Sequence, residues 1–277
     1  MLAMILLRFT MPQSLYPLYL CLLLPIALHA NEVRSFKFET EYQPGSQEIR
    51  VLLPDDYNAD RTYPVVYVLP VERGFGSRWG SPLDVIKSID AHNKHKAIFV
   101  QMGFALEPWF GDHAEDPRAR QDSYLREFVV PFIEKTYSTP GTKQGRLLLG
   151  FSKSGWGAIS LLLKYPNFFG YAASWDAPMM FDRFRYSMKS VYGTQEQLDK
   201  YRPDLLAKRN ASEFTDTPRI VLTGEDLWSS DVRRFHAHLN ELGIQHHYDI
   251  SQRVRHRWDA KWVEPSLNAL IDLSQKR

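Results

Sequence analysis

LLLGFSKSGWGA, residues 147–158, is the stretch that decides the fold. An apolar run ends at Gly150, Ser152 follows two positions later, and a cluster of small residues then opens an apolar segment that stops at Pro166. This order predicts a strand, a sharp turn and a helix with a serine at the apex, the arrangement called a nucleophile elbow. Small residues are needed there because the strand and helix backbones nearly touch behind the serine.

The spacing departs slightly from the usual elbow pattern G-x-S-x-G, because Ser154 stands at the last glycine position and Gly155 follows it. Serine is the next smallest polar residue, so the turn remains feasible. The alternative interpretation is a glycine-rich turn between a strand and a helix that carries no chemistry.

Composition bounds the class of protein. The chain has 277 residues, is 44% hydrophobic and carries a formal net charge of +2. A chain of this length can bury one large core, and a single domain is common for α/β folds of this size. The near-neutral charge gives no reason to expect a nucleic-acid partner.

Residues 1–30 resemble an export signal. Arg8 is the only charged residue, residues 15–28 are mostly apolar, and Ala30 is a small residue suited to a cleavage site. We expect a cleaved signal peptide, a mature domain over residues 31–277, and a periplasmic or secreted location without a stable membrane span. The rival interpretation is an uncleaved anchor. Cys21 is the only cysteine, so the mature chain would have no thiol for a disulfide, a nucleophile or a zinc site.

Periodicity predicts the remaining elements. Alternating stretches at 33–40 and 47–53, separated by a turn at Pro44-Gly45, are typical of half-buried strands. Continuous apolar runs indicate strands buried on both faces, and these fall at 64–69, 97–102, 146–149, 171–174 and 220–223. A last strand is expected at 246–250. Helical spacing is found at 82–92, 122–137, 231–242 and 261–273, and residues 186–213 suggest a helical excursion over the sheet edge.

Alternating strands and helices predict an α/β fold with a mostly parallel central sheet and helices on both faces. Ligands of such sheets bind at the carboxyl ends of the strands. Aromatic and acidic residues cluster after the predicted strand ends, which suggests a pocket with stacking surfaces. The residues expected to contact substrate are Glu72, Trp109, Trp175, Asp176 and Trp228.

A serine alcohol needs a base to remove its proton, and the base needs an acid to fix its tautomer. In α/β-hydrolases these residues follow one another as Ser, then Asp or Glu, then His. We therefore expect Ser152 as nucleophile, Asp226 as orienting acid and His256 as general base and acid. For the acid, Glu225 and Asp176 remain alternatives, and Asp231 is close in sequence.

The histidine is chosen by its place in the chain. His236 and His238 fall within a predicted helix, and His246 and His247 stand at the start of a strand, which is the wrong end. His256 follows the last strand. The oxyanion hole should use two backbone N–H groups, one from Lys153 and one from Val71 or Glu72, because Pro70 has none.

Residues from about 34 to 274 resemble the Putative esterase family, which includes S-formylglutathione hydrolases, feruloyl and acetyl-xylan esterases and mycolyltransferases. The segments that carry the resemblance are RVLLPDDY at 50–57, YPVVYVL at 63–69, residues 127–137, GFSKSGWGA at 150–158 and HRW at 256–258. The resemblance implies an α/β-hydrolase fold and ester hydrolysis without a cofactor, and it supports the expected triad.

Two positions depart from the family pattern. Family members commonly have His-Gly-Gly where this chain has Pro70-Val71-Glu72, and Met or Leu where it has Lys153. The first change puts the second oxyanion donor in doubt and brings the Glu72 carboxylate near a developing negative charge. A lysine beside the nucleophile could attract an acidic substrate, pair with Glu72 or lie in solvent.

Arginines at 253, 255 and 257 surround His256 and could bind an acidic ester, although such runs are usually solvated. No metal is expected, because the neighbouring histidines and acids lack the ligand set of a known site. The sequence thus predicts an exported serine esterase that acts on a small-molecule or polysaccharide ester. The alternatives are an acyltransferase and a non-catalytic ligand-binding protein on a degenerate hydrolase scaffold.

Overall fold

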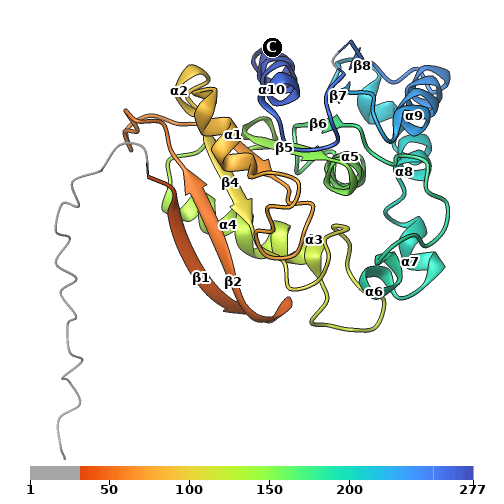
Figure 1. Ribbon diagram of the computed structural model, residues 1–277, viewed down its shortest axis with the longest axis horizontal. Coiled ribbons are helices and arrows are strands. Elements are labelled where there is room, and N and C mark those ends of the chain that lie inside the picture. Colours follow the sequence, from red (N-terminus) through yellow and green to blue (C-terminus); the bar gives the residue numbers. More distant parts are fainter. Residues whose placement is uncertain (1–31, 252, 277) are drawn as a thin grey trace, which may run out of the picture.

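A single eight-stranded sheet organises the fold (Figure 1). The computed structural model describes residues 32–251 and 253–276. In order across the sheet the strands are β1 (Arg34–Thr40), β2 (Gln43–Leu52), β4 (Ile98–Met102), β3 (Val65–Val68), β5 (Arg146–Phe151), β6 (Tyr171–Trp175), β7 (Ile220–Thr223) and β8 (His246–Asp249).

The pairing is antiparallel for β1 with β2 and for β2 with β4, and it is parallel for every later pair. The mostly parallel sheet predicted from the sequence is therefore confirmed. All parallel strands point their carboxyl ends to one edge, where the loops after β3, β5, β6, β7 and β8 meet.

Strand β3 shows why the central strands are continuous apolar runs. Val65 and Tyr67 pack into the core on one face of the sheet, whereas Val66 and Val68 pack into the core on the other face. Successive side chains of a strand point to opposite faces, so a strand covered on both sides has no position for a polar side chain.

One predicted turn is wrong. The tight turn between β1 and β2 lies at Glu41-Tyr42, and Pro44-Gly45 lies inside β2. The register shifts there, because Thr40 pairs with Gln43 whereas Glu39 pairs with Ser46. Pro44 and Gly45 are the two extra residues of this bulge, and Gly45 takes a φ of 71° that favours glycine.

Helices cover both faces of the sheet, as predicted. One face carries α1 (Pro82–Ser88), α2 (Ala91–Lys94) and α10 (Ala260–Gln275). The other face carries α3 (Gln121–Ser123), η1 (Tyr124–Val129), α4 (Val130–Thr136), α5 (Lys153–Lys164), α8 (Pro203–Arg209) and α9 (Ser229–Glu241). The predicted helix over 82–92 is divided at Asp90, which has a left-handed φ of 58°.

The excursion between β6 and β7 is helical, and it consists of α6 (Met188–Tyr192), α7 (Gln195–Asp199), α8 and η3 (Ala211–Phe214). Met188, Val191, Tyr192 and Leu198 pack with Trp109 and Trp156 in a small core of their own. This excursion therefore rests on the elbow helix α5, which contains Trp156, and on the loop that contains Trp109.

The expected signal peptide lies outside the described residues. Within 32–251 and 253–276, no helix has the length and apolar character needed to cross a bilayer.

Candidate active site

Ser152 stands at the apex of a sharp turn between β5 and α5, as the sequence predicts. Its φ of 55° and ψ of −132° are unusual for a residue with a side chain. The strain is held by neighbours, because the Ser152 N–H donates to the Trp175 carbonyl at 3.0 Å. The Ser154 hydroxyl braces the same turn by accepting from the Phe151 N–H at 3.0 Å and donating to the Phe151 carbonyl at 2.9 Å.

The small residues around the elbow are required by contact distances. A Cβ on Gly150 would lie 2.2 Å from the Ser154 carbonyl oxygen, and a Cβ on Gly155 would lie 2.4 Å from the Ser174 hydroxyl. These distances are far below van der Waals contact. Ser154 fits at the usual glycine position because its hydroxyl is used as the brace and Gly155 takes over the closest approach to β6.

Three side chains form a continuous hydrogen-bonded chain. His256 Nε2 lies 2.9 Å from Ser152 Oγ, and His256 Nδ1 lies 2.6 Å from Asp176 Oδ2. A carboxylate can only accept, so Nδ1 carries the proton and Nε2 has a free electron pair directed at the serine hydroxyl. Asp176 is fully buried and the His256 side chain is 9% exposed, so both are largely shielded from water.

The acid differs from the one expected. Asp226 was predicted to orient His256, but Asp176, an alternative in the sequence analysis and also an expected substrate contact, is hydrogen-bonded to the imidazole. Asp226 contributes its backbone instead: its N–H donates to Asp176 Oδ1 at 3.0 Å. The N–H groups of Leu227 and Trp228 also donate to this carboxylate, at 3.0 and 2.9 Å.

The pairing of the strands explains why Asp176, and not Asp226, is bound to His256. β6 and β7 are neighbours, with Trp175 paired to Thr223, so the residues that follow them emerge side by side. Gly224 turns the chain with a φ of 86°, and a Cβ there would lie 2.0 Å from the Trp175 indole nitrogen. The loop after β7 consequently wraps its N–H groups around Asp176.

Both expected oxyanion donors line the pocket beside Ser152. The backbone N–H groups of Lys153 and Val71 have no hydrogen-bond acceptor among the described residues. Glu72, whose charge would oppose an oxyanion, turns back into its own loop, where Oε2 accepts from the Arg78 N–H at 3.1 Å.

The pocket that contains Ser152 has a volume of about 540 Å³. Of the expected substrate contacts, Glu72, Trp109 and Trp228 line it. Trp175 does not, because its ring is fully buried and stacks on Trp262 with centroids 5.2 Å apart. Two further lining residues, Pro178 and Leu227, lie in the segments that follow β6 and β7 but were not singled out from the sequence. The others come from positions more distant from a strand end: Arg78, Trp79, Glu107, Tyr186 and Ser187.

Lys153 forms an ion pair with Glu107 across the pocket wall, so the suggested pairing with Glu72 is wrong. The two side chains are 20% and 37% exposed. The pair places one positive and one negative charge beside the nucleophile. The arginines at 253, 255 and 257 are exposed and do not line this pocket.

The loop that carries Glu107 and Trp109 is held from behind by Gln121, which is buried. Gln121 Oε1 accepts from the N–H groups of Trp109 and Phe110 at 2.9 and 2.8 Å, and Nε2 donates to the Glu107 carbonyl at 3.2 Å. One side chain thus binds the backbone of this loop at three residues, of which Glu107 and Trp109 line the pocket.

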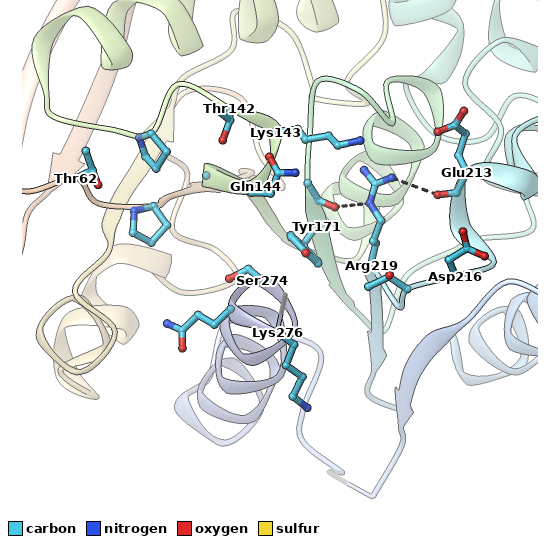
Figure 2. A pocket seen from close by; sticks show the side chains of 16 residues that line it. Thr62, Thr142, Lys143, Gln144, Tyr171, Glu213, Asp216, Arg219, Ser274 and Lys276 are labelled. Atoms are coloured by element: carbon cyan, nitrogen blue, oxygen red, sulfur yellow. Dashed lines mark hydrogen bonds between the residues drawn. The ribbon is translucent and has the colours of Figure 1, made fainter.

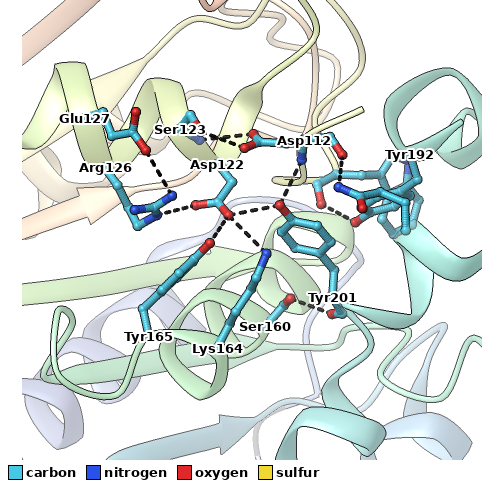
Figure 3. A network of polar contacts seen from close by, with 12 residues as sticks. Asp112, Asp122, Ser123, Arg126, Glu127, Ser160, Lys164, Tyr165, Tyr192 and Tyr201 are labelled. Carbon is cyan, nitrogen blue, oxygen red and sulfur yellow. Dashed lines mark hydrogen bonds and ion pairs between the residues drawn. The ribbon is translucent and has the colours of Figure 1, made fainter. Parts of the chain in front are cut away.

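A buried polar network anchors the same region to α5 and to the helical excursion (Figure 3). Asp122 is fully buried and accepts from Arg126, Lys164, Tyr165 and Tyr201. Burial lowers the pKa of Lys164 even though the Asp122 carboxylate beside it opposes this shift.

Asp112 extends this network to the pocket loop. Its carboxylate accepts from the backbone N–H and the hydroxyl of Ser123, and its own N–H donates to the Tyr201 hydroxyl. Burial raises the pKa of Asp112, and the neighbouring Asp122 charge raises it further. Buried hydrogen bonds and ion pairs therefore hold the loop that forms this wall of the pocket.

A larger hollow of about 930 Å³ lies at the opposite edge, at the amino ends of β3, β5, β6 and β7 (Figure 2). Its most prominent cation, Arg219, donates to the carbonyls of Pro166, Phe169, Gly170 and Glu213. No histidine is among the described residues that line it. Arg219 serves the backbone there, so the smaller pocket around Ser152 is the candidate active site.

Among the described residues, Asp176, Asp226 and His256 are the group spaced closely enough to hold a metal ion, with their ligand atoms within 4.8 Å of one another. The donor set does not fit this role. The two Asp176 oxygens already accept three backbone N–H groups and the His256 proton, which fills about four acceptor sites of a carboxylate.

Comparison with known proteins identifies the family of the chain. A sequence profile of the family described as Putative esterase matches residues 41–270. Esterase MT1326 of Mycobacterium tuberculosis (strain CDC 1551 / Oshkosh) is 28% identical over 147 residues, which are 52% of this chain and 32% of that protein. The match therefore spans less than half of the relative's length.

Two solved structures share the fold. The fluorophosphonate-binding serine hydrolase FphF of Staphylococcus aureus superposes with a TM-score of 0.70 at 16% identity and covers 88% of this chain and 99% of that one. A ferulic acid esterase superposes with a TM-score of 0.67, also at 16% identity, and covers 88% and 98%. Together with the strand order, these likenesses confirm the predicted α/β-hydrolase fold.

Proposed function

We propose a reaction from one premise, that this chain belongs to the Putative esterase family. The proposal is that the protein hydrolyses carboxylic esters, with Ser152 as nucleophile, His256 as general base and acid, and Asp176 as orienting acid. The observation that carries it is the unbroken chain of hydrogen bonds from Ser152 through His256 to Asp176 at the wall of a pocket.

In the first half-reaction, His256 Nε2 takes the proton of Ser152 Oγ while Oγ attacks the ester carbonyl carbon. The resulting tetrahedral oxyanion would accept from the backbone N–H groups of Lys153 and Val71. The intermediate collapses when the C–O bond to the alcohol breaks, and His256 gives its proton to the leaving oxygen. The Asp176 carboxylate, hydrogen-bonded to His256 Nδ1, stabilises the imidazolium.

In the second half-reaction, His256 takes a proton from water, and the resulting hydroxide attacks the acyl carbon. His256 then returns the proton to Ser152 Oγ as the carboxylic acid leaves. An alcohol in place of water would make the same site an acyltransferase. The pocket is open to solvent through the exposed rim residues Tyr186 and Leu227, which favours water as the acceptor.

For the substrate, we propose an ester carried on a carbohydrate. The lining of this pocket combines partly exposed aromatic rings, Trp79 and Trp228, with the charged side chains of Arg78, Glu107 and Lys153. Sugar rings have apolar faces that stack on aromatic rings and hydroxyl edges that hydrogen-bond to such charged groups. Comparing hydrolysis of acylated oligosaccharides with that of the matching simple alkyl esters tests this point.

We also propose that the protein is exported, on the basis of the apolar stretch and single charge in residues 1–30. Amino-terminal sequencing of the protein recovered from its native host tests this. A terminus near residue 31 supports cleavage, whereas recovery of Met1 in a membrane fraction supports an anchor.

The direct test of the reaction is mass spectrometry of the folded protein after treatment with a fluorophosphonate, because this probe modifies only an activated serine. We expect one adduct on the wild-type protein and none on Ser152→Ala. His256→Ala should react far more slowly, because the serine then lacks its base. Ser187→Ala is a matched control, because it removes a serine hydroxyl from the pocket lining and leaves the elbow intact, so this variant should still be labelled.

A folded wild-type protein that gives no adduct and hydrolyses no ester would contradict the proposal. The site would then be that of a ligand-binding protein on a hydrolase scaffold, an outcome that the changed residues at 70–72 would permit.

A further inference from the structure

Two carboxylates, and not one, surround the histidine of the site. Asp176 follows β6 and Asp226 follows β7, and both strands end at the same edge of the sheet. A carboxylate oxygen of each lies within 4.8 Å of the other and of a ring nitrogen of His256. The proposed reaction uses Asp176 alone, which leaves the side chain of Asp226 without a function.

The two carboxylates have opposite surroundings. Asp176 is fully buried, and its oxygens accept four hydrogen bonds. Asp226 is exposed, and its side chain has no hydrogen-bond or ion-pair partner among residues 32–251 and 253–276. Its position is nonetheless fixed, because its own N–H and those of the next two residues are bound to Asp176. Among the described residues, no cation pairs with the Asp226 carboxylate, which lies close to the imidazole.

We propose that Asp226 stabilises the positive charge that develops on His256 during catalysis, acting from the solvent side while Asp176 orients the ring from the buried side. This inference rests on the proposed esterase function. The Asp226 side chain is not among the described residues that line the pocket and makes no hydrogen bond to the triad, so it acts through His256 and is a positioning residue rather than a catalytic one.

The other charges around His256 are accounted for. Glu107 pairs with Lys153, and Glu225, next to Asp226 in the chain, pairs with Arg233. Two kinds of group surround His256. Its neutral neighbours are the rings of Trp79, Phe151 and Trp175. The charged groups that face it or flank it in its own loop are Asp176, Asp226, Glu72, Arg78, the pair Glu107–Lys153, and the exposed Arg255 and Arg257.

The expected effect has a distinctive pH signature. A single exposed charge at this distance shifts the midpoint of a titration by about 0.5 pH unit. Asp226→Asn removes the charge, so His256 should lose its proton at a lower pH, and the acidic limb of kcat/KM should move down by about 0.5 unit. The plateau should fall about threefold, because the same charge no longer stabilises the imidazolium of the transition state.

Below the midpoint of the acidic limb, the lower plateau and the larger fraction of deprotonated His256 change kcat/KM by equal and opposite factors. Wild type and Asp226→Asn should therefore have equal rates at acidic pH and differ about threefold at alkaline pH. Structural damage to the loop would lower the rate by the same factor at every pH and would leave the midpoint unchanged.

The experiment measures kcat/KM for a neutral ester, p-nitrophenyl acetate, from about pH 5 to about pH 9. Glu225→Gln is the matched control: it removes a charge from the same loop, but one already paired with Arg233. It should keep the wild-type midpoint. In about 1 M salt the difference between wild type and Asp226→Asn should largely disappear.

A second readout does not need turnover. The NMR titration of the His256 ring, assigned by its loss in His256→Gln, should have a lower midpoint in Asp226→Asn. An unchanged midpoint, a uniform loss at all pH values, or an equal shift in Glu225→Gln would overturn the proposal. A protein that hydrolyses no ester but shows the NMR shift would refute the esterase function and retain the charge coupling.

Discussion

Asp176→Asn is the substitution that tests the architecture of the site most severely. The change keeps the size of the side chain and replaces one carboxylate oxygen by an NH₂ group. Oδ1 accepts from the N–H groups of Asp226 and Trp228, and Oδ2 accepts from Leu227 and from His256. Either orientation of the amide therefore points its NH₂ group at two donors.

The less damaging orientation keeps the amide oxygen at the Oδ1 position and places NH₂ against Leu227 and His256. The imidazole can then satisfy this contact only by moving its proton to Nε2, which takes away the electron pair that Ser152 needs. We expect kcat/KM to fall about 10³- to 10⁴-fold. One hydrogen bond to the side chain is lost, and the others become weaker because the acceptor no longer carries a charge. Together these changes should lower the free energy of unfolding by about 2–4 kcal/mol.

The assay combines kcat/KM on p-nitrophenyl acetate, the rate of labelling by a fluorophosphonate and a urea unfolding curve. Asp226→Asn is the matched control, with the same chemical change one strand away and an effect of about threefold. The reasoning is refuted if Asp176→Asn keeps more than about a tenth of the activity while Asp226→Asn loses about a thousandfold, because Asp226 would then be the orienting acid.

Three further substitutions test the support of the site. Gly157→Ala would place a methyl group 2.1 Å from the Phe110 ring, so the free energy of unfolding should fall by about 1–3 kcal/mol. An unchanged urea midpoint would show that the ring moves aside without a loss of stability. Asp122→Asn leaves the partly buried cations Arg126 and Lys164 without their counter-charge and should lower the free energy of unfolding by about 3 kcal/mol or more, whereas a loss below about 1 kcal/mol would contradict a structural role for the network. Burial lowers the pKa of His246, so the unfolded chain takes up the proton first and acidification below about pH 6.5 favours unfolding. His246→Gln should make Tm fall less steeply between about pH 7.5 and about pH 5, and an equal slope would exclude this histidine as a source of acid sensitivity.

Most of the fold was predictable because most stretches of the chain match the pattern of one kind of element. Val65–Val68 is too short and too β-branched for a helix, and its two faces enter two cores. The elbow was equally clear, since only small residues can stand where a Cβ on Gly150 would meet backbone at 2.2 Å. The turn at Pro44-Gly45 was predicted wrongly because a glycine with positive φ serves a bulge inside a strand as well as a turn.

The sequence predicted those site residues whose position is determined by which strand they follow. Ser152 and His256 each follow a strand with no rival of the same type at that end, so their positions in the chain were sufficient. The acid was ambiguous, because Asp176 and Asp226 follow adjacent paired strands and emerge side by side. What separates them is the direction of the backbone N–H groups in the loop after β7, which converge on Asp176.

That convergence also explains what holds the second carboxylate in place. The same three N–H groups that hold Asp176 against His256 hold the backbone of Asp226 in place, so a substitution at Asp176 disturbs both charges, whereas one at Asp226 removes only its own. The two substitutions should therefore not be additive: after Asp176→Asn, adding Asp226→Asn should change kcat/KM by a factor different from the threefold effect expected in the wild-type background. Equal factors in the two backgrounds would mean that the two carboxylates act on His256 independently.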